Sequence, residues 1–393
     1  MAQYLTPGIY IEEVSNGARP IEAVGTTTAA FIGEAPRSGA HPGEPVAVVN
    51  WGQFRDIFVG DGAASTPLSH ALAGYFLNGG SRAYVVNTSR AGLSDALEAL
   101  TGYDDISMVA APGWTDAATY DALLTHCEGL TTCFAILDGP ATCTDIAALT
   151  RVGSAKASSP GGAGEGPDKD KPAATALRPR ESARGYGAVY VPHLMVRDPL
   201  EPAKIVAVAP SGHLAGIYAR TDVERGVFKA PANVAVRGAL GLTQRLNDAE
   251  QGVLNPAGVN VIRFMTGRGV LVWGARTLTV SDPEWRYVPV RRLFIMMEAS
   301  IRRGTQWVVF EPNDERLWKS IRRDVSAFLM LLWRQGALQG TTPEEAFFVR
   351  CDAETNPPEV IDAGRVVIEI GVAPVKPAEF VIFRIGQSSA ETL

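Results

Sequence analysis

The sequence predicts a short β-strand near each of its ends. Residues 5–14 read LTPGIYIEEV and residues 373–385 read APVKPAEFVIFRI. Runs of β-branched and aromatic residues that are bounded by Pro or Gly are typical of strands. From residue 380 to residue 385 both faces of the predicted strand are apolar, which indicates burial on both faces. Because chain ends usually fray, each of these strands requires a sheet to join.

Two arrangements satisfy this requirement. Both strands can pair within their own domain, since native proteins rarely leave long strand edges unpaired. Alternatively, each strand can add to a sheet of a neighbouring copy of the chain, which is the β-augmentation mode of assembly. The strand pattern by itself leaves both arrangements open.

The length and composition indicate a soluble globular protein of two or three domains. The chain has 393 residues, of which 46% are hydrophobic and 20% are charged. No apolar run approaches the roughly 20 residues of a membrane span, and no basic segment followed by an apolar core opens the chain. We therefore expect no membrane insertion and no secretory signal.

The four cysteines predict neither a disulfide framework nor a metal site. They form no CxxC pair and have no histidine at ligand spacing. Free, mostly buried thiols in a reducing cytosol are the expected state of Cys127, Cys133, Cys143 and Cys351. We expect no metal and no cofactor.

Charge is distributed unevenly along the chain. Residues 1–150 carry 5 basic and 16 acidic side chains, whereas residues 261–350 carry 14 basic and 9 acidic side chains. Such an asymmetry can mark an interaction surface. No basic run is interleaved with aromatic residues, so a nucleic-acid partner is not expected.

Strands and helices alternate over residues 25–260, which predicts an α/β domain around a largely parallel sheet. Residues 153–185 interrupt this pattern with a low-complexity loop rich in Gly, Pro, Ser and charge. No strand precedes its glycines directly and no GK[ST] follows them, so a solvated loop is favoured over a phosphate cradle. The predicted strands are 26–33, 46–49, 83–86, 106–111, 133–138, 188–191 and 205–209, and the predicted helices are 67–77, 93–100 and 117–130.

Residues 261–373 predict an α+β domain. Helices are expected at 289–303 and 315–335, and strands at 269–273, 307–310, 347–350 and 366–370. The helix at 315–335 has an apolar stripe at helical spacing, consisting of Leu317, Ile321, Val325, Phe328, Leu329 and Leu332.

Its other side carries Lys319, Arg322, Arg323 and Arg334. These charges form either an ordinary solvated face or a basic strip that docks on an acidic partner.

The sequence contains no catalytic motif. Nucleophile elbows, P-loops, HExxH and dinucleotide-binding fingerprints are all missing. Ser211 and His213 are the best candidate pair, but side chains two residues apart on a turn rarely point at each other. Adjacent acidic pairs on a strand, such as Asp104-Asp105 and Glu12-Glu13, point to opposite faces. The scattered histidines are interpreted as surface or hydrogen-bonded residues, namely His41, His70, His126 and His193.

Eight blocks, in a fixed order from residue 6 to residue 380, closely resemble the contractile tail sheath family. This family is shared by myophage tails, R-type pyocins and related contractile injection systems. The region 87–185 lacks recognisable family blocks. The blocks are 6–14 (TPGIYIEEV), 76–86 (FLNGGSRAYVV), 209–222 (APSGHLAGIYARTD), 226–233 (GVFKAPAN), 254–260 (LNPAGVN), 273–278 (WGARTL), 309–313 (VFEPN) and 376–380 (KPAEF).

The resemblance implies a helical homopolymer of stacked rings around an inner tube, whose contraction drives the tube through a target envelope. It implies an N-terminal arm and linker (1–24), an α/β outer domain (25–260), a tube-facing C-terminal α+β domain (261–373) and a C-terminal arm (374–393). The arms would add strands to a neighbour's C-terminal domain near 366–370. The implied arm residues are Ile9, Tyr10, Ile11, Glu12, Val14, Phe380, Val381, Ile382, Phe383 and Ile385.

The resemblance also implies that Lys319, Arg322, Arg323 and Arg334 contact the inner tube protein. Further implied partners are baseplate and tail terminator or cap proteins. Assembly is expected in the bacterial cytoplasm, as part of a phage tail or of a tail-like particle that can be released. Two alternatives are an α/β hydrolase-like enzyme and one component of a type VI secretion sheath. The second is disfavoured because both arms and the complete C-terminal domain lie on one chain.

Overall fold

The computed structural model describes residues 20–153 and 176–382, and it divides into two compact units. The larger unit comprises the described residues of 24–299 together with 374–382. The smaller unit comprises residues 20–23 and 300–373. Helix α7 (Val288–Gly304) contains the point at which the chain leaves the larger unit.

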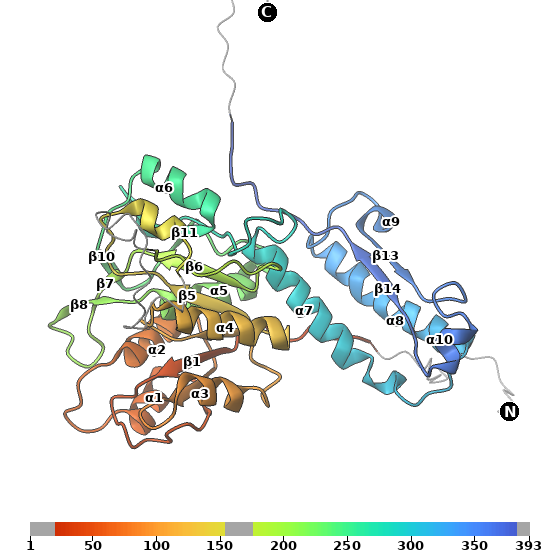
Figure 1. Cartoon of the computed structure of the whole chain (residues 1–393), viewed down its shortest axis with the longest axis horizontal. Helices are drawn as coiled ribbons and strands as arrows, with labels where there is room; N and C mark the ends of the chain where they lie inside the picture. Colours follow the sequence, from red (N-terminus) through yellow and green to blue (C-terminus); the bar gives the residue numbers. More distant parts are fainter. Residues whose placement is uncertain (1–19, 154–175, 383–393) are drawn as a thin grey trace, which may run out of the picture. The chain divides into compact units, whose positions relative to one another are not determined.

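The larger unit is built on a nine-stranded mixed sheet (Figure 1). The strand order is β2-β3-β1-β4-β5-β6-β11-β12-β9. All pairs from β3 to β11 are parallel, whereas β2, β12 and β9 add in antiparallel orientation. The predicted α/β class with a largely parallel sheet is therefore confirmed. The strands are β1 (Ala29–Gly33), β2 (Val46–Val48), β3 (Ala83–Asn87), β4 (Met108–Ala110), β5 (Phe134–Asp138), β6 (Gly187–Val191), β9 (Val234–Ala235), β11 (Val259–Met265) and β12 (Gly269–Val272).

Helices and a smaller sheet complete this unit. The antiparallel sheet has the order β10-β7-β8 and consists of β7 (Leu194–Arg197), β8 (Ile205–Val208) and β10 (Ala239–Leu242). The helices are α1 (Trp51–Phe58), α2 (Pro67–Asn78), α3 (Leu93–Leu100), α4 (Ala117–Leu130), α5 (Ser211–Arg225) and α6 (Asp248–Leu254), with 3₁₀ turns η1 (Ile146–Thr150) and η3 (Asn255–Ala257).

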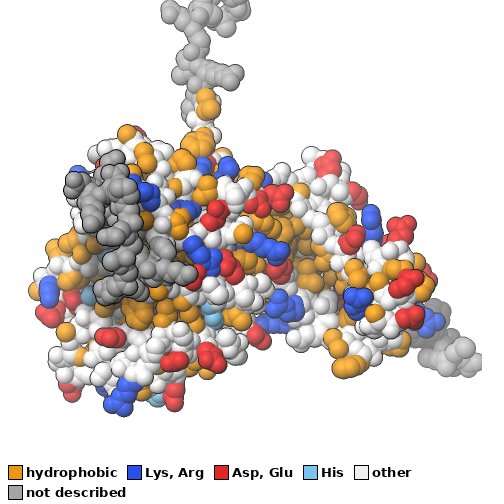
Figure 2. Space-filling model, viewed as in Figure 1, with side chains coloured by type: hydrophobic (Ala, Val, Ile, Leu, Met, Phe, Trp, Pro, Cys, Tyr) orange, Lys and Arg blue, Asp and Glu red, His pale blue; other side chains and the backbone are white. Residues whose placement is uncertain are grey.

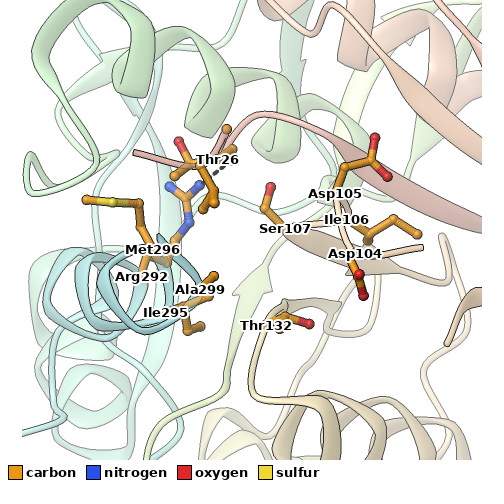
Figure 3. Close-up of a pocket in the computed structure, with 12 residues that line it drawn as sticks. Thr26, Asp104, Asp105, Ile106, Ser107, Thr132, Arg292, Ile295, Met296 and Ala299 are labelled. Carbon is orange, nitrogen blue, oxygen red and sulfur yellow. Dashed lines mark hydrogen bonds between the residues drawn. The ribbon is translucent and has the colours of Figure 1, made fainter. Parts of the chain in front are cut away.

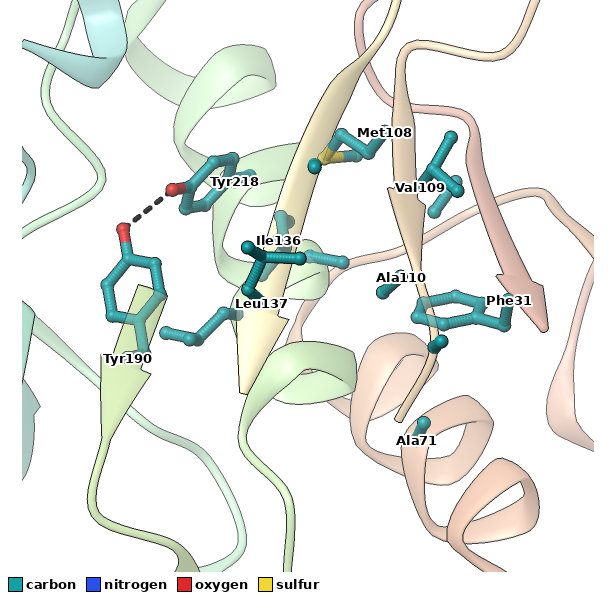
Figure 4. Packing of buried hydrophobic residues seen from close by; sticks show 14 of the residues in the cluster. Phe31, Ala71, Met108, Val109, Ala110, Ile136, Leu137, Tyr190 and Tyr218 are labelled. Carbon is teal, nitrogen blue, oxygen red and sulfur yellow. Dashed lines mark hydrogen bonds between the residues drawn. The ribbon is translucent and has the colours of Figure 1, made fainter. Parts of the chain in front are cut away.

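Helices α2 and α5 pack closely because glycines face the contact. A Cβ atom at Gly212 would overlap the backbone of Ala71, and one at Gly74 would overlap the imidazole of His213. Side chains of β1, β4 and β5 share the core with Tyr218 of α5 and Tyr190 of β6 (Figure 4). The hydroxyls of Tyr190 and Tyr218 lie 2.6 Å apart there, so each buried phenol has a hydrogen-bond partner.

The smaller unit contains α8 (Glu315–Arg334), α9 (Pro343–Ala346), α10 (Pro358–Asp362) and a two-stranded antiparallel sheet of β13 (Phe347–Arg350) and β14 (Glu369–Val372). Helix α8 begins at Asp314, whose carboxylate accepts hydrogen bonds from the backbone N–H groups of Arg316 and Leu317. All six residues of the predicted apolar stripe of α8 are buried.

Two predicted strands differ from the structure. Residues 307–310 contain a 3₁₀ turn, η4 (Gln306–Val308), which follows α7 directly, and Phe310 has a positive φ of 70°. Val309 and Phe310 are exposed and belong to no sheet of the part of the chain that the structure describes, so their strand propensity has no effect. The strand expected at 366–370 lies instead at Glu369–Val372.

The boundary of the larger unit also differs from the expected 260/261. The chain leaves this unit between Ala299 and Ser300, because β11 and β12 extend its sheet and α7 begins within it. None of the helices in the described ranges is both long and apolar enough to span a membrane.

Candidate assembly interfaces

Residues 374–382 form the described part of the C-terminal segment, and Glu379 fastens this segment to the larger unit. Arg276 donates to both oxygens of the carboxylate, from Nη2 to Oε2 at 2.6 Å and from Nε to Oε1 at 2.9 Å and to Oε2 at 3.2 Å. Asn255 Nδ2 donates to Oε1 at 2.8 Å, and the Tyr287 hydroxyl donates to Oε2 at 3.2 Å. The Arg276 fork therefore binds the carboxylate in the bidentate geometry that makes such pairs strong.

The environment of Glu379 favours the ionised carboxylate. Partial burial on its own would raise the pKa of Glu379, but the hydrogen bonds from Arg276, Asn255 and Tyr287 outweigh it and lower the pKa. Burial and the neighbouring Glu379 carboxylate raise the pKa of Tyr287, which keeps this phenol protonated as a donor.

The three residues after Glu379 are exposed and apolar. The side chains of Phe380, Val381 and Ile382 are 71%, 70% and 79% exposed. In Figure 1 these last described residues run away from the larger unit, and Figure 2 shows apolar atoms there. The other predicted arm residues lie outside the described residues; they are Ile9, Tyr10, Ile11, Glu12, Val14, Phe383 and Ile385.

The sheet of the smaller unit has two strands within the described residues. Phe347 pairs with Val372 and Arg350 pairs with Glu369 at its two ends. Phe348 covers Gly371 on the neighbouring strand, where a Cβ atom would overlap its ring. Phe348 and Ile370 are exposed. Because isolated two-stranded sheets are only marginally stable, further strands on its edges would stabilise this one.

The basic side of α8 differs in part from its prediction. Lys319, Arg323 and Arg334 are exposed, whereas Arg322 is half-buried and lies about 100° around the helix from Arg323 by the 3.6-residue period. Arg316 was not among the predicted residues, although it lies seven residues before Arg323 on the same face and is exposed. The spacing of i and i+7 would have identified it.

Two of these cations are paired within the helix. Lys319 Nζ lies 2.8 Å from Glu315 Oε1, and both side chains are exposed. Arg323 Nε donates to Oδ1 of the buried Asp324 at 2.9 Å. A partner of this face would therefore compete with acidic groups of the same helix.

Ser211 and His213 do not form a catalytic pair. Ser211 is the first residue of α5, and its hydroxyl donates to Asp138 Oδ2 at 2.7 Å while its backbone N–H donates to Oδ1 at 2.7 Å. Asp138 thus caps the helix from the end of β5. His213 is fully buried on the α2 side, and its Nδ1 has no hydrogen-bond partner among the described residues. Burial, with the nearby His70, lowers the pKa of His213 to about 4.

Three of the remaining four histidines lie against an acidic side chain or a carbonyl oxygen, and His126 is half-buried. His70 Nε2 lies 3.2 Å from Asp198 Oδ2, and His41 Nδ1 lies 3.3 Å from Glu44 Oε2. His193 Nε2 lies 3.0 Å from the carbonyl oxygen of Gly139. No three His, Cys, Asp or Glu side chains are grouped as metal ligands within residues 20–153 and 176–382.

The cysteines in these ranges form no disulfide, and Cys127 Sγ and Cys133 Sγ lie 3.4 Å apart. Cys127, Cys133 and Cys351 are buried, and Cys143 is half-buried.

A small cavity of about 20 Å³ lies beside α7 in the larger unit (Figure 3). It is lined by Asp104 and Asp105 on one side and by Arg292 on the other. A cavity of this size has room for about one water molecule. Asp105 accepts a hydrogen bond from the Tyr84 hydroxyl and forms an ion pair with Arg82. The expectation that Asp104 and Asp105 share no acid–base role stays a prediction.

Arg292 forms a buried ion pair at the wall of this cavity. Its Nη1 and Nη2 donate to Asp222 Oδ1 and Oδ2 at 2.9 and 2.6 Å, and both side chains are 3% exposed. Arg292 Nη2 also donates to the carbonyl oxygen of Thr26, and the Thr26 hydroxyl donates to Asp222 at 2.6 Å. This cluster joins α5, α7 and the segment before β1.

Two sequence families match consecutive parts of the chain. Residues 87–278 match the phage tail sheath protein central domain, and residues 280–388 match the phage tail sheath C-terminal domain. A putative prophage major tail sheath protein of Pseudomonas aeruginosa is 29% identical over 232 residues, which cover 56% of each chain. The tail sheath protein of Vibrio phage KVP40 is 28% identical over 184 residues, covering 46% of this chain. The matches span only 26% and 56% of the length of these relatives.

Solved structures match over nearly the whole chain. The sheath complex of the extracellular contractile injection system PVC in its contracted state is 31% identical, with all of both chains covered and a TM-score of 0.77. The contracted helical sheath of the anti-feeding prophage is 32% identical, with 98% of this chain and 100% of that chain covered and a TM-score of 0.76. These matches agree with the family features in the sequence, and the chain therefore belongs to the contractile tail sheath family.

Proposed function

We propose that this chain is a structural sheath subunit that polymerises helically around an inner tube and contracts to drive the tube through a target envelope. The observation that carries this proposal is the whole-chain similarity to contracted sheath assemblies. Heterologous contacts that do not close into a ring generate such a helical polymer. The partners would be copies of the chain, the inner tube protein, the baseplate and a tail terminator or cap.

The proposed contacts between subunits are the two terminal arms. The exposed apolar Phe380, Val381 and Ile382 would leave their own subunit and add a strand to the β13–β14 sheet of a neighbour. Residues 9–14 would add a strand in the same way. Strand addition suits a contracting lattice because its main-chain hydrogen bonds can survive rigid-body movement of the domains that they connect.

The proposed contact with the inner tube is the basic face of α8. It comprises Lys319, Arg323, Arg334 and the newly identified Arg316, with Arg322 at its flank. Rim charges of this kind mostly tune association rate and register, so an acidic tube surface would be guided by this face.

A structural role is proposed in place of catalysis. The best candidate pair is occupied otherwise, since Ser211 is bound to Asp138 and His213 is buried apart from it. Assembly would take place in the bacterial cytoplasm as part of a phage tail or tail-like particle, such as a pyocin or an injection system that is released.

Deletion of residues 1–14 tests the assembly proposal. The truncated subunit should remain folded by circular dichroism but sediment as a monomer under conditions in which the full chain forms tubes. The matched control is Asp248→Ala, which removes an exposed carboxylate of the larger unit and should leave tube formation unchanged. Normal tubes from the truncated chain, seen by negative-stain electron microscopy, would refute the arm model.

A further inference from the structure

The binding site for Glu379 is also held together by hydrogen bonds that do not involve the C-terminal segment. The backbone N–H of Arg276 donates to Asn260 Oδ1 at 2.7 Å, and Asn260 Nδ2 donates to the Arg276 carbonyl oxygen at 2.7 Å. Arg276 Nη1 donates in addition to the carbonyl oxygen of Asn255 at 3.0 Å. Gly274 allows this turn to lie close to Asn260, because a Cβ atom there would crowd the Asn260 side chain.

Arg276 is therefore held at its backbone by Asn260 and at its guanidinium by the carbonyl oxygen of Asn255. Asn260 lies on β11, which is a paired strand of the nine-stranded sheet, so the site is supported by the most extensive element of the larger unit. The side chains of Arg276 and Glu379 are 12% and 20% exposed, which limits screening of the pair by salt.

The environment of the chain changes from hydrogen-bonded to exposed at the residue after Glu379. Glu379 accepts hydrogen bonds from three residues, whereas Phe380, Val381 and Ile382 are mostly exposed. The exposed apolar run thus begins at the residue after the bound carboxylate.

We propose that Arg276 and Glu379 form a clamp that fixes the root of the C-terminal arm, so that the strand presented to a second copy of this chain begins at Phe380. This inference rests on the proposed assembly function. The residues are positioning residues, because they act on the partner only through the arm.

The physical effect of the clamp is a smaller entropy cost of assembly. A strand that starts from a fixed point samples fewer positions than one attached through a loose segment, which raises its effective concentration at the acceptor sheet. A bidentate pair also fixes direction as well as distance, since both guanidinium nitrogens must face both carboxylate oxygens.

The clamp is tested first in the unassembled subunit. A small dye is attached to Ile382→Cys in a Cys143→Ser background, because Cys143 is the half-buried cysteine and the other three are buried. Time-resolved fluorescence anisotropy then reports the local motion of the arm root. Glu379→Gln and Arg276→Gln should each increase this motion. The double variant should not exceed Glu379→Gln, because the Arg276 pair is already broken in that variant.

Assembly is measured next with unlabelled variants. We expect Glu379→Gln to raise the critical concentration for tube formation about tenfold or more, the size typical for loss of a charge-assisted hydrogen-bond pair. The control Asp248→Asn changes an exposed carboxylate that pairs with the half-buried Arg263, and it should leave both the anisotropy and the critical concentration unchanged.

The outcomes separate this inference from the assembly proposal. Unchanged dye motion in Glu379→Gln overturns the clamp, whatever the chain assembles into. Increased dye motion with normal tube formation overturns the role of the clamp in assembly. If a chain that ends at Glu379 also forms normal tubes, the arm model itself fails, although the clamp remains as a feature of the subunit.

Discussion

Replacement of Asp222 by alanine should strongly destabilise the larger unit. Asp222 accepts two hydrogen bonds from Arg292 and one from Thr26, at distances of 2.6 to 2.9 Å. The substitution removes all three and leaves the guanidinium of Arg292 buried without its counter-ion. Arg292 keeps its hydrogen bond to the Thr26 carbonyl oxygen and its position over the Tyr218 ring.

The size of the effect follows from the burial of both partners. Removal of one member of a buried ion pair costs about 3–5 kcal/mol of unfolding free energy, mainly because a charge remains buried and unpaired. At about 2–4 °C for each kcal/mol in a unit of this size, the thermal midpoint should fall by about 6–20 °C.

Urea denaturation and differential scanning calorimetry of the full chain measure this effect. Asp248→Ala, which removes an exposed carboxylate that pairs with Arg263, should change the unfolding free energy by less than about 1 kcal/mol. The double variant Asp222→Ala with Arg292→Met should recover most of the loss, because no buried charge then lacks a partner. The reasoning fails if Asp222→Ala costs no more than the Asp248→Ala control.

Two further predictions concern pH and charge. Because the pKa of His213 is about 4 in the folded chain and about 6.5 when unfolded, the unfolded state binds the proton first as pH falls. The free energy of unfolding should therefore decline below pH 6.5. In urea unfolding, the difference in unfolding free energy between wild type and His213→Leu should shift by about 2 kcal/mol from pH 7.5 to pH 5. The exposed His41→Gln serves as control, and a constant difference would exclude a buried neutral imidazole. Replacement of Arg316, Arg323 and Arg334 by Glu should weaken co-assembly with the inner tube in pelleting assays. The difference from wild type should be smaller at high salt, because salt screens exposed charges. Equal reversal of Arg55, Arg90 and Arg197, exposed arginines of the larger unit, should have no effect, and an equal loss in both sets would contradict a specific basic face.

The elements with clear local signals could be predicted from the sequence. Helices α3 and α4 have the predicted bounds, and the apolar stripe of α8 is buried as its 3.6-residue period requires. The parallel sheet followed from short apolar strands that alternate with helices, a pattern that leaves few alternative folds.

Helix α5 could not be recognised in this way. Its residues from Ser211 to Thr221 are all buried, so no polar face alternates with an apolar one to give a helical period. Its glycines also lower helix propensity, yet Gly212 is required by the close approach of Ala71. Tertiary packing therefore decides this helix, and the sequence pattern suggested a turn.

The Glu379 site could not be predicted for a different reason. Most of its members lie in three separate sequence blocks, around residues 255–260, 276 and 379, each visible only as a family feature, and Tyr287 lies outside all of the blocks. The structure gives these blocks one physical role, because Asn260 holds Arg276 and Arg276 binds Glu379. Side-chain geometry between distant segments has no signature in spacing or periodicity.

The two arginine–carboxylate pairs lie close in sequence to every point at which the chain passes between its units. The passages are at residues 23/24, 299/300 and 373/374. On the side of the larger unit, Thr26 and Arg292 share the Asp222 cluster, and Glu379 is bound by Arg276. Two guanidinium groups, those of Arg276 and Arg292, thus anchor all three connections on the side of the larger unit.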